Sequence, residues 1–157
     1  MNSAQHTLQI RRMTAADLDP VIEIAQSLSD APAWPRSAYT AALNPDGLPP
    51  RIALVASYAS SNTVAGFAIA SLLAPEAELE SIAVAAQFQR HGIGRALLAS
   101  LAVELRDAQA AEIILEARAS NQPALALYLE FGFVVSGRRT RYYQFPVDDA
   151  VLMRLRL

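Results

Sequence analysis

The stretch 82-IAVAAQFQRHGIGRALL-98 decides how the rest of the sequence is interpreted. Its first residues end an apolar run typical of a strand, and the apolar spacing that follows over 95–108 is helical. Between the two, Gly92 and Gly94 lack Cβ atoms, so the backbone can approach an anion at the N-terminus of the helix. The stretch therefore predicts a strand, a loop that can bind an anion, and a helix.

The residues of this loop limit the kinds of anion-binding motif that it can form. Arg90 and Arg95 can add positive charge, and His91 and Ile93 complete the loop. An ordinary tight turn accounts for the two glycines equally well. Two other nucleotide motifs are excluded, because the third glycine of G-x-G-x-x-G would fall at Leu97 and no Gly-Lys-Ser/Thr exists in the chain.

Further elements are predicted on both sides of this unit. Thr14 and Asp17 form a capping-box pattern, and Asn121 is a suitable helix N-cap. The order of elements predicts a mixed α/β sheet flanked by helices. The predicted strands are 8–13, 52–58, 64–73, 79–84, 112–117, 133–143 and 151–157, and the predicted helices are 14–28, 37–43, 95–108 and 121–131.

Length and composition limit the possible classes. A chain of 157 residues, of which 53% are hydrophobic and 18% charged, is expected to form one globular domain over 1–157. The formal net charge of −2 gives no reason to expect a nucleic-acid partner. The chain has no Cys, which excludes disulfides, thiolate metal sites and a cysteinyl acyl-enzyme.

Targeting and metal signals are weak. The first residues do not resemble a signal peptide, and the apolar run 64–74 is shorter than the ~20 residues that span a bilayer, so a cytoplasmic protein without a membrane partner is expected. No metal is expected, since no element has His, Asp or Glu at ligand spacing. His6, near the N-terminus, and His91, in the loop, are not expected to act as bases.

The loop over 89–94 resembles the Gln/Arg-x-x-Gly-x-Gly/Ala sequence of GNAT acetyltransferases. Other segments resemble the ribosomal-protein-alanine N-acetyltransferase subfamily. The resemblance implies the GNAT fold, a twisted and mostly antiparallel sheet of about seven strands with about four helices, and acetyl-CoA as cosubstrate. The matching segments are Ile82–Val84, Glu116–Asn121, Ala126–Phe133, Arg138–Arg139 and Tyr142–Tyr143.

The resemblance also implies catalytic roles for two residues. Glu116 falls on the position that accepts the proton of the amine, although a cleft-facing or edge charge would also explain a carboxylate in this apolar strand. Tyr128 falls on the tyrosine that protonates the departing CoA thiolate. Without the resemblance, Tyr128 is equally well explained as an ordinary half-buried aromatic residue of a helix.

The cosubstrate contacts are carried over in the same way. The backbone of Ile82, Ala83 and Val84 would run along the pantetheine, with the Val84 N–H polarising the thioester carbonyl. Asn121 resembles a CoA-contacting asparagine, although its capping role explains it equally well. The pyrophosphate loop would consist of Arg90, His91, Gly92, Ile93, Gly94 and Arg95.

The acceptor is less closely defined. Glu76, Glu78 and Glu80 alternate along one strand face and can attract a basic peptide, or form an ordinary solvated face. The basic and aromatic residues at 138–143 can line the acceptor site or lie on an edge strand. Trp34 resembles the subfamily's Pro-Trp-Ser segment, but here the order is Ala-Trp-Pro.

The expected function is direct acetyl transfer, in a ternary complex, to the N-terminal α-amine of a peptide or protein. The expected acceptor is the alanine of a small-subunit ribosomal protein. A lysine or small-molecule amine is the alternative acceptor. A non-catalytic acetyl-CoA-binding module is the alternative class.

Overall fold

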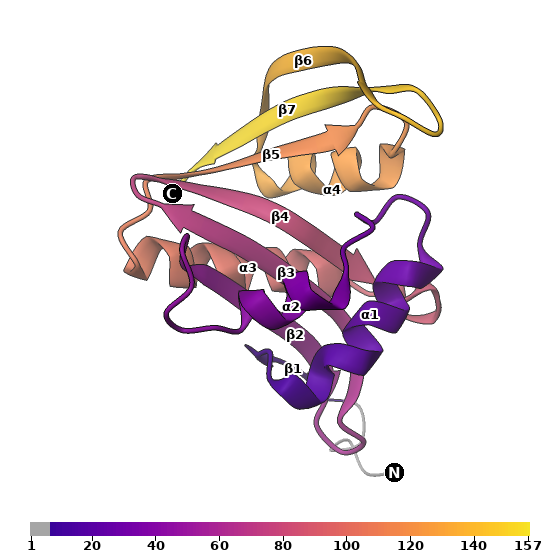
Figure 1. Ribbon diagram of the computed structural model, residues 1–157, viewed down its shortest axis with the longest axis vertical. Coiled ribbons are helices and arrows are strands. Elements are labelled where there is room, and N and C mark those ends of the chain that lie inside the picture. Colours follow the sequence, from indigo (N-terminus) through magenta and orange to yellow (C-terminus); the bar gives the residue numbers. More distant parts are fainter. Residues whose placement is uncertain (1–6) are drawn as a thin grey trace.

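Seven strands form one mixed sheet in the computed structural model, which describes residues 7–157 (Figure 1). The strand order is β1-β2-β3-β4-β5-β7-β6. All neighbouring strands are antiparallel except β4 and β5, which confirms the predicted mixed and mostly antiparallel α/β fold. The strands are β1 Leu8–Arg12, β2 Arg51–Tyr58, β3 Thr63–Leu73, β4 Glu76–Val84, β5 Glu112–Arg118, β6 Val134–Tyr143 and β7 Asp148–Arg156.

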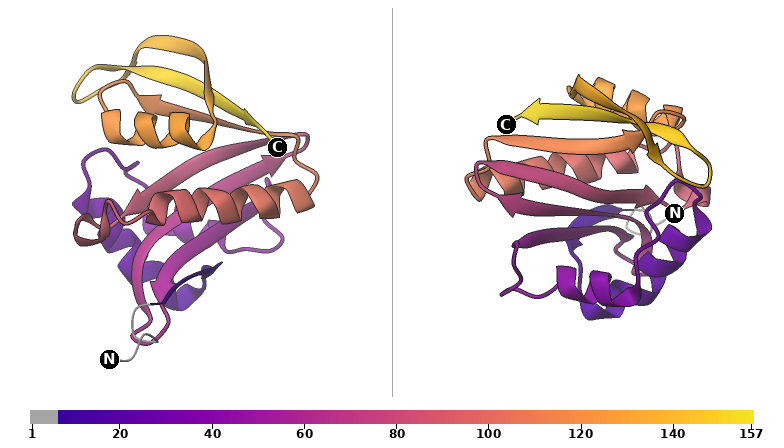
Figure 2. Two further views of the ribbon diagram at one scale, coloured as in Figure 1. Left: turned by 180° about the vertical axis from the view of Figure 1, so that it is seen from behind. Right: turned by 45° about the horizontal axis from the view of Figure 1, so that its top comes forward.

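Helices cover both faces of the sheet (Figures 1 and 2). The helices are α1 Leu18–Ser27, α2 Arg36–Ala42, α3 Ile93–Asp107 and α4 Gln122–Phe131. One hydrophobic cluster joins α1 and α2 to the face that we call the α1/α2 face. A second cluster joins α3 and α4 to the opposite face, the α3/α4 face. Within residues 7–157, no helix is both long and apolar enough to cross a membrane.

The apolar spacing of α3 explains why it lies flat on the sheet. Leu97, Leu101 and Leu105 follow one another at intervals of four residues and are completely buried. Each side chain that is fully removed from water stabilises the fold by about 1.5–3 kcal/mol. The helix is therefore fixed along its length, and its N-terminus is held at the end of β4.

The parallel pair β4 and β5 opens after a short contact. The register covers three residue pairs, from Glu76 with Glu112 to Glu78 with Ile114. Beyond them β4 pairs only with β3, and Figure 1 shows β4 and β5 diverging toward their C-terminal ends. One edge of β4 is thus uncovered by a neighbouring strand from Leu79 onward.

A β-bulge lies where this opening begins. Leu79 opposes Ala70 and Ser81 opposes Ile69, so Glu80 is the extra residue of the bulge. A bulge bends a strand and increases its twist. The bulge therefore accompanies the divergence of β4 from β5.

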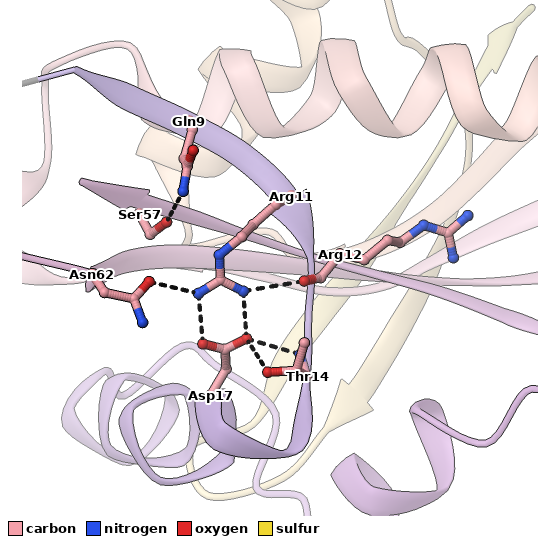
Figure 3. Close-up of polar contacts among 7 residues, drawn as sticks. All are labelled: Gln9, Arg11, Arg12, Thr14, Asp17, Ser57 and Asn62. Carbon is pink, nitrogen blue, oxygen red and sulfur yellow. Dashed lines mark hydrogen bonds and ion pairs between the residues drawn. The ribbon is translucent and has the colours of Figure 1, made fainter. Parts of the chain in front are cut away.

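A buried carboxylate joins β1 to the start of α1 (Figure 3). Asp17 is 2% exposed and accepts hydrogen bonds from Nη1 and Nη2 of Arg11, at 2.7 and 2.8 Å. It also accepts the Thr14 N–H at 2.8 Å, which completes the predicted capping box, and Arg11 donates to Asn62. Arg11 lowers the pKa of Asp17, so the carboxylate stays charged despite burial.

Several predicted boundaries are wrong by two to four residues. The first helix starts as a 3₁₀ turn over Ala15–Asp17, and α1 follows only from Leu18. β4 and β7 each begin three residues early, because Glu76 pairs with Leu73 and Asp148 pairs with Tyr143. Pairing across a turn recruits residues that single-strand periodicity does not mark.

Candidate active site

The predicted anion loop ends in an uncapped helix N-terminus. Gly92 is the N-cap residue of α3, with φ 77° and ψ 11°, and no side chain bonds to the cap. The first intrahelical bond runs from the Ala96 N–H to the Gly92 carbonyl, 3.0 Å. The N–H groups of 93–95 therefore lack intrahelical acceptors, and together with the helix dipole they are able to bind an anion.

Glycine is required at the two positions of this loop for different physical reasons. A Cβ on Gly92 would meet nothing within 4 Å, but its positive φ is unfavourable for other residues. A Cβ on Gly94 would lie 3.0 Å from Leu127 Cδ2 on α4. Gly92 therefore shapes the loop, whereas Gly94 allows α3 and α4 to pack closely.

The remaining loop residues contribute unequally. Arg90 and His91 are exposed, and Arg90 has a positive φ of 66°. Arg95 is exposed on the first turn of α3, with its guanidinium 5.9 Å from the centroid of the Phe131 ring. Ile93 is buried in the core, so only its backbone can face an anion.

The uncovered edge of β4 presents backbone groups to the opening. The Val84 carbonyl accepts from Gln89 Nε2 at 3.0 Å, while the Ala85 N–H bonds to Ala65 on β3. N–H and C=O of one strand residue point to the same side, so the Val84 N–H lies on the side that β5 has left. Ile82 and Val84 pack against the α3/α4 cluster, and Ala83 belongs to the other cluster.

Glu116 projects from β5 on the α1/α2 face. Its strand neighbours Leu115 and Ala117 belong to the α3/α4 cluster, so alternation turns Glu116 the other way. The carboxylate is 28% exposed, and its Oε1 lies 3.2 Å from Arg139 Nε. Because β7 separates β5 from β6, Arg139 reaches over β7 to make this contact.

Tyr128 is held on the α3/α4 side of the sheet. It is 6% exposed, packs on Phe133 with the ring centroids 5.7 Å apart, and has a pKa raised by burial and by the nearby Tyr143. The phenol therefore keeps its proton at neutral pH. The pKa of Tyr143 is raised in turn by burial and by Glu116, so Tyr143 interacts with both predicted catalytic residues.

Asn121 has the predicted capping role. Its Oδ1 accepts the Ala124 N–H at 3.3 Å, at the start of α4. The capping bond uses only the oxygen of the amide. A contact with a cosubstrate would therefore fall to its NH₂ group.

Arginines on β2 and β6 form ion pairs with carboxylates of other strands. Glu80 pairs with Arg51 at 2.8 Å, and Arg138 pairs with Asp149 at 2.8 Å. Glu76 is exposed at the start of the same strand face.

The α1–α2 segment contains an apolar cavity. Trp34 lines it and packs against Tyr39 with the ring centroids 5.2 Å apart. The cavity has a volume of about 280 Å³ and is also lined by Ile22, Leu28 and Pro32. Trp34 is therefore packed against α2.

Three features of the site carry no local sequence signal. The bond from Gln89 to the Val84 carbonyl and the Glu116–Arg139 contact depend on how separate elements meet. Among residues 7–157 the Ser81 hydroxyl is buried without a hydrogen-bond partner, and a serine within a strand gives no indication of this. Paired positions across strands would have been needed to find them.

The histidines and acidic groups form no metal centre in the part of the chain that the structure describes. No three His, Asp or Glu side chains of residues 7–157 lie together in a way that could hold a metal. His91 is exposed in the anion loop. His6 lies outside the described residues.

Comparison with known proteins agrees with this geometry. The chain is 44% identical to the Escherichia coli [ribosomal protein bS18]-alanine N-acetyltransferase over 94 residues, which span 59% of this chain and 64% of that enzyme. It is 35% identical to the Mycobacterium tuberculosis N-alpha-acetyltransferase RimI over 98% of this chain and 96% of that protein.

A solved structure and a family profile extend the comparison. The crystal structure of the E. coli ribosomal-protein-S18-alanine N-acetyltransferase superposes with a TM-score of 0.81 and 32% identity, covering 96% of this chain and 94% of that chain. The profile of the Acetyltransferase (GNAT) family matches residues 19–133. The chain therefore belongs to the GNAT acetyltransferase family, as its resemblance to that family predicted.

Proposed function

We propose that this chain is an N-acetyltransferase that moves the acetyl group of acetyl-CoA to the N-terminal α-amine of a protein or peptide. The observation that carries the proposal is the opening between β4 and β5. It has an uncapped helix N-terminus at one end, and Glu116 and the protonated Tyr128 on either side of the sheet. These are the anion site, base and acid that acetyl transfer to an amine needs.

The fit of acetyl-CoA is supported by the orphan donors of α3. The N–H groups of 93–95 would bind the pyrophosphate, and Arg90, His91 and Arg95 would surround it. The backbone of Ile82, Ala83 and Val84 would follow the pantetheine. When bound, acetyl-CoA supplies an acetyl group activated as a thioester. Asn121 would add a contact through its amide nitrogen.

Glu116 would act as the base. An amine is mostly ammonium at neutral pH, so the carboxylate must take a proton before the nitrogen can attack the thioester carbon. Arg139 holds Oε1, which leaves Oε2 for the amine. As the C–N bond forms, the Val84 N–H stabilises the negative charge on the carbonyl oxygen.

Tyr128 would act as the acid. As the C–S bond breaks, its hydroxyl donates a proton to the leaving thiolate. The nitrogen loses its second proton as the amide forms, which restores the phenol, and the proton held by Glu116 returns to solvent. The transfer would be direct, and the absence of Cys excludes a cysteinyl acyl-enzyme.

The finer assignments also belong to this proposal. We expect the acceptor to be the alanine of a small-subunit ribosomal protein, and the enzyme to act in the cytoplasm. The names of the two bacterial relatives support an N-terminal acceptor. One domain over 1–157 would carry the whole reaction, without metal.

A thiol-release assay with three peptides tests the proposal. One peptide has a free N-terminal alanine and no lysine, the second is N-terminally blocked and contains lysine, and the third is blocked and lacks lysine. Release only with the first supports α-amine acetylation. Release only with the second would show a lysine acetyltransferase, and no release with any peptide despite acetyl-CoA binding would favour a binding module.

A further inference from the structure

Three carboxylates and two arginines lie together on the α1/α2 face where β4 and β5 separate. Glu78 and Glu80 from β4 share this face with Glu116 from β5, because Glu78 pairs in register with Ile114, which has the same parity as Glu116. In the described part of the chain, two arginines form ion pairs with two of these three carboxylates. Arg51 pairs with Glu80, and Arg139 pairs with Glu116.

Glu78 is the carboxylate without a counterion. Within residues 7–157, no ion pair or hydrogen bond involves its side chain, which is exposed to solvent. Burial of part of the group, then Glu80 and Glu116, raise its pKa. In the free protein, the negative charge of Glu78 is therefore disfavoured by the neighbouring residues.

A second group on the same face also lacks a partner. Ser81 is 4% exposed, and its Oγ has no hydrogen-bond partner in the described chain. Ser81 opposes Ile69 of the α1/α2 cluster, and Glu78 opposes Ser71 two residues further along β3, so both side chains project from the same face of β4. An unpaired buried hydroxyl is unusual and indicates a missing polar partner.

We propose that Glu78 is a positioning residue that binds the acceptor as its ammonium ion, with Ser81 Oγ as an additional hydrogen-bond acceptor, before Glu116 removes the proton. The inference rests on the proposed function and adds a division of labour to it. The ammonium ion supplies the third positive charge, so that three cations face three carboxylates. Glu78 binds the charged amine, and Glu116 converts it to the nucleophile.

The raised pKa of Glu78 sets the sign of two effects. A carboxylate whose pKa is higher in the folded state gives stability at low pH that is lost as pH rises through that pKa. Glu78→Gln should therefore leave the melting temperature at neutral pH unchanged or higher. Acceptor binding needs the ionised carboxylate, so the wild-type acceptor KM should fall as pH rises through the same range.

The experiment is steady-state kinetics of the full chain with an alanine N-terminal peptide. Glu78→Gln should raise the acceptor KM about tenfold or more, and kcat/KM should fall because KM rises. In this variant the acceptor KM should no longer fall as pH rises. The groups facing Glu78 are Glu80 with Arg51, and Glu116 with Arg139 and Tyr143; they remain in the variant. Glu76→Gln, an exposed carboxylate on the same strand, is the matched control and should change neither quantity.

The other outcomes separate this inference from the proposed function. An unchanged acceptor KM in Glu78→Gln, with Glu116→Gln slow, would overturn the role of Glu78 and leave the acetyltransferase intact. A fall in kcat with unchanged KM would also overturn it, because Glu78 would then act in the chemical step. Wild type that releases no thiol with any peptide would overturn both.

Discussion

The two sides of the opening between β4 and β5 consist of different kinds of chemical group. The side proposed for acetyl-CoA consists mainly of backbone groups, apolar residues and basic loop residues within one stretch, 82–95, to which Asn121 adds one contact. The side proposed for the acceptor consists of charged groups from four strands, namely Arg51, Glu78, Glu80, Glu116 and Arg139. A continuous segment is sufficient for an anion site, whereas a site for a cation that must lose a proton depends on charges held at fixed distances from one another.

The largest effect should come from the acceptor side. Glu116→Gln should lower turnover by about 10²–10⁴-fold and leave acetyl-CoA affinity unchanged, since it removes a base and no cosubstrate contact. Kinetics and calorimetry measure the two quantities, the latter without acceptor. Glu112→Gln, on the same face of β5 and near Arg154, is the control. An equal loss in both variants would mean that charge on β5, and not a base at Glu116, supports the rate.

A substitution at Tyr128 tests whether this buried tyrosine acts as an acid in the reaction or only packs against its neighbours. Tyr128→Phe should lower turnover by about 10²-fold with little change in melting temperature, because only a hydroxyl is lost. The variant should recover part of its deficit with a thioester whose thiol is more acidic, since such a thiolate needs less protonation. Tyr58→Phe is the control for a ring in a half-buried setting. The same deficit with both thioesters would contradict the role as acid.

A charged group far from the opening should affect stability alone. Asp17→Asn leaves the Arg11 guanidinium without its carboxylate and should lower the free energy of unfolding by about 2 kcal/mol. The pKa of Asp17 is lowered in the fold, so its contribution is full above the unfolded value of about 3.9 and is lost as pH falls through the folded pKa.

Chemical denaturation at several pH values measures this effect. The variant should lose less stability than wild type on acidification. Asp19→Asn removes a well-exposed partner of Arg36 and should change little. A large fall in turnover of folded Asp17→Asn at saturating substrates would show that the N-terminal network reaches the active site.

The smallest effect should come from the acetyl-CoA side. Gly92→Ala retains space but forces alanine into a left-handed conformation, which costs about 1–2 kcal/mol. Thermal unfolding and calorimetry should show a modest loss of stability and weaker acetyl-CoA binding. Gly137→Ala, whose Cβ would meet Leu152 at an ordinary 3.8 Å, is the control. Unchanged acetyl-CoA affinity in a folded Gly92→Ala protein would count against the loop as the pyrophosphate site.

The amino-acid sequence alone determined the fold class, the order of elements and the position of the glycine loop before α3. These follow from periodicity, helix caps and glycines, which act between residues close together in the chain. The capping residues Thr14 and Asn121 and the seven strands were predicted for this reason and are present. The roles of Glu116, Tyr128 and the loop residues came from the family resemblance and stay predictions.

Only the tertiary structure decided which charges meet. The sequence showed Glu78, Glu80 and Glu116 as acidic residues on two strands and Arg139 as one of several arginines near the C-terminus. Register between β4 and β5, the bulge at Glu80 and the reach of Arg139 over β7 then assigned two carboxylates to counterions. Among residues 7–157 they left Glu78 without one. Electrostatic interactions depend on distance through space, and strand pairing sets that distance between residues far apart in sequence.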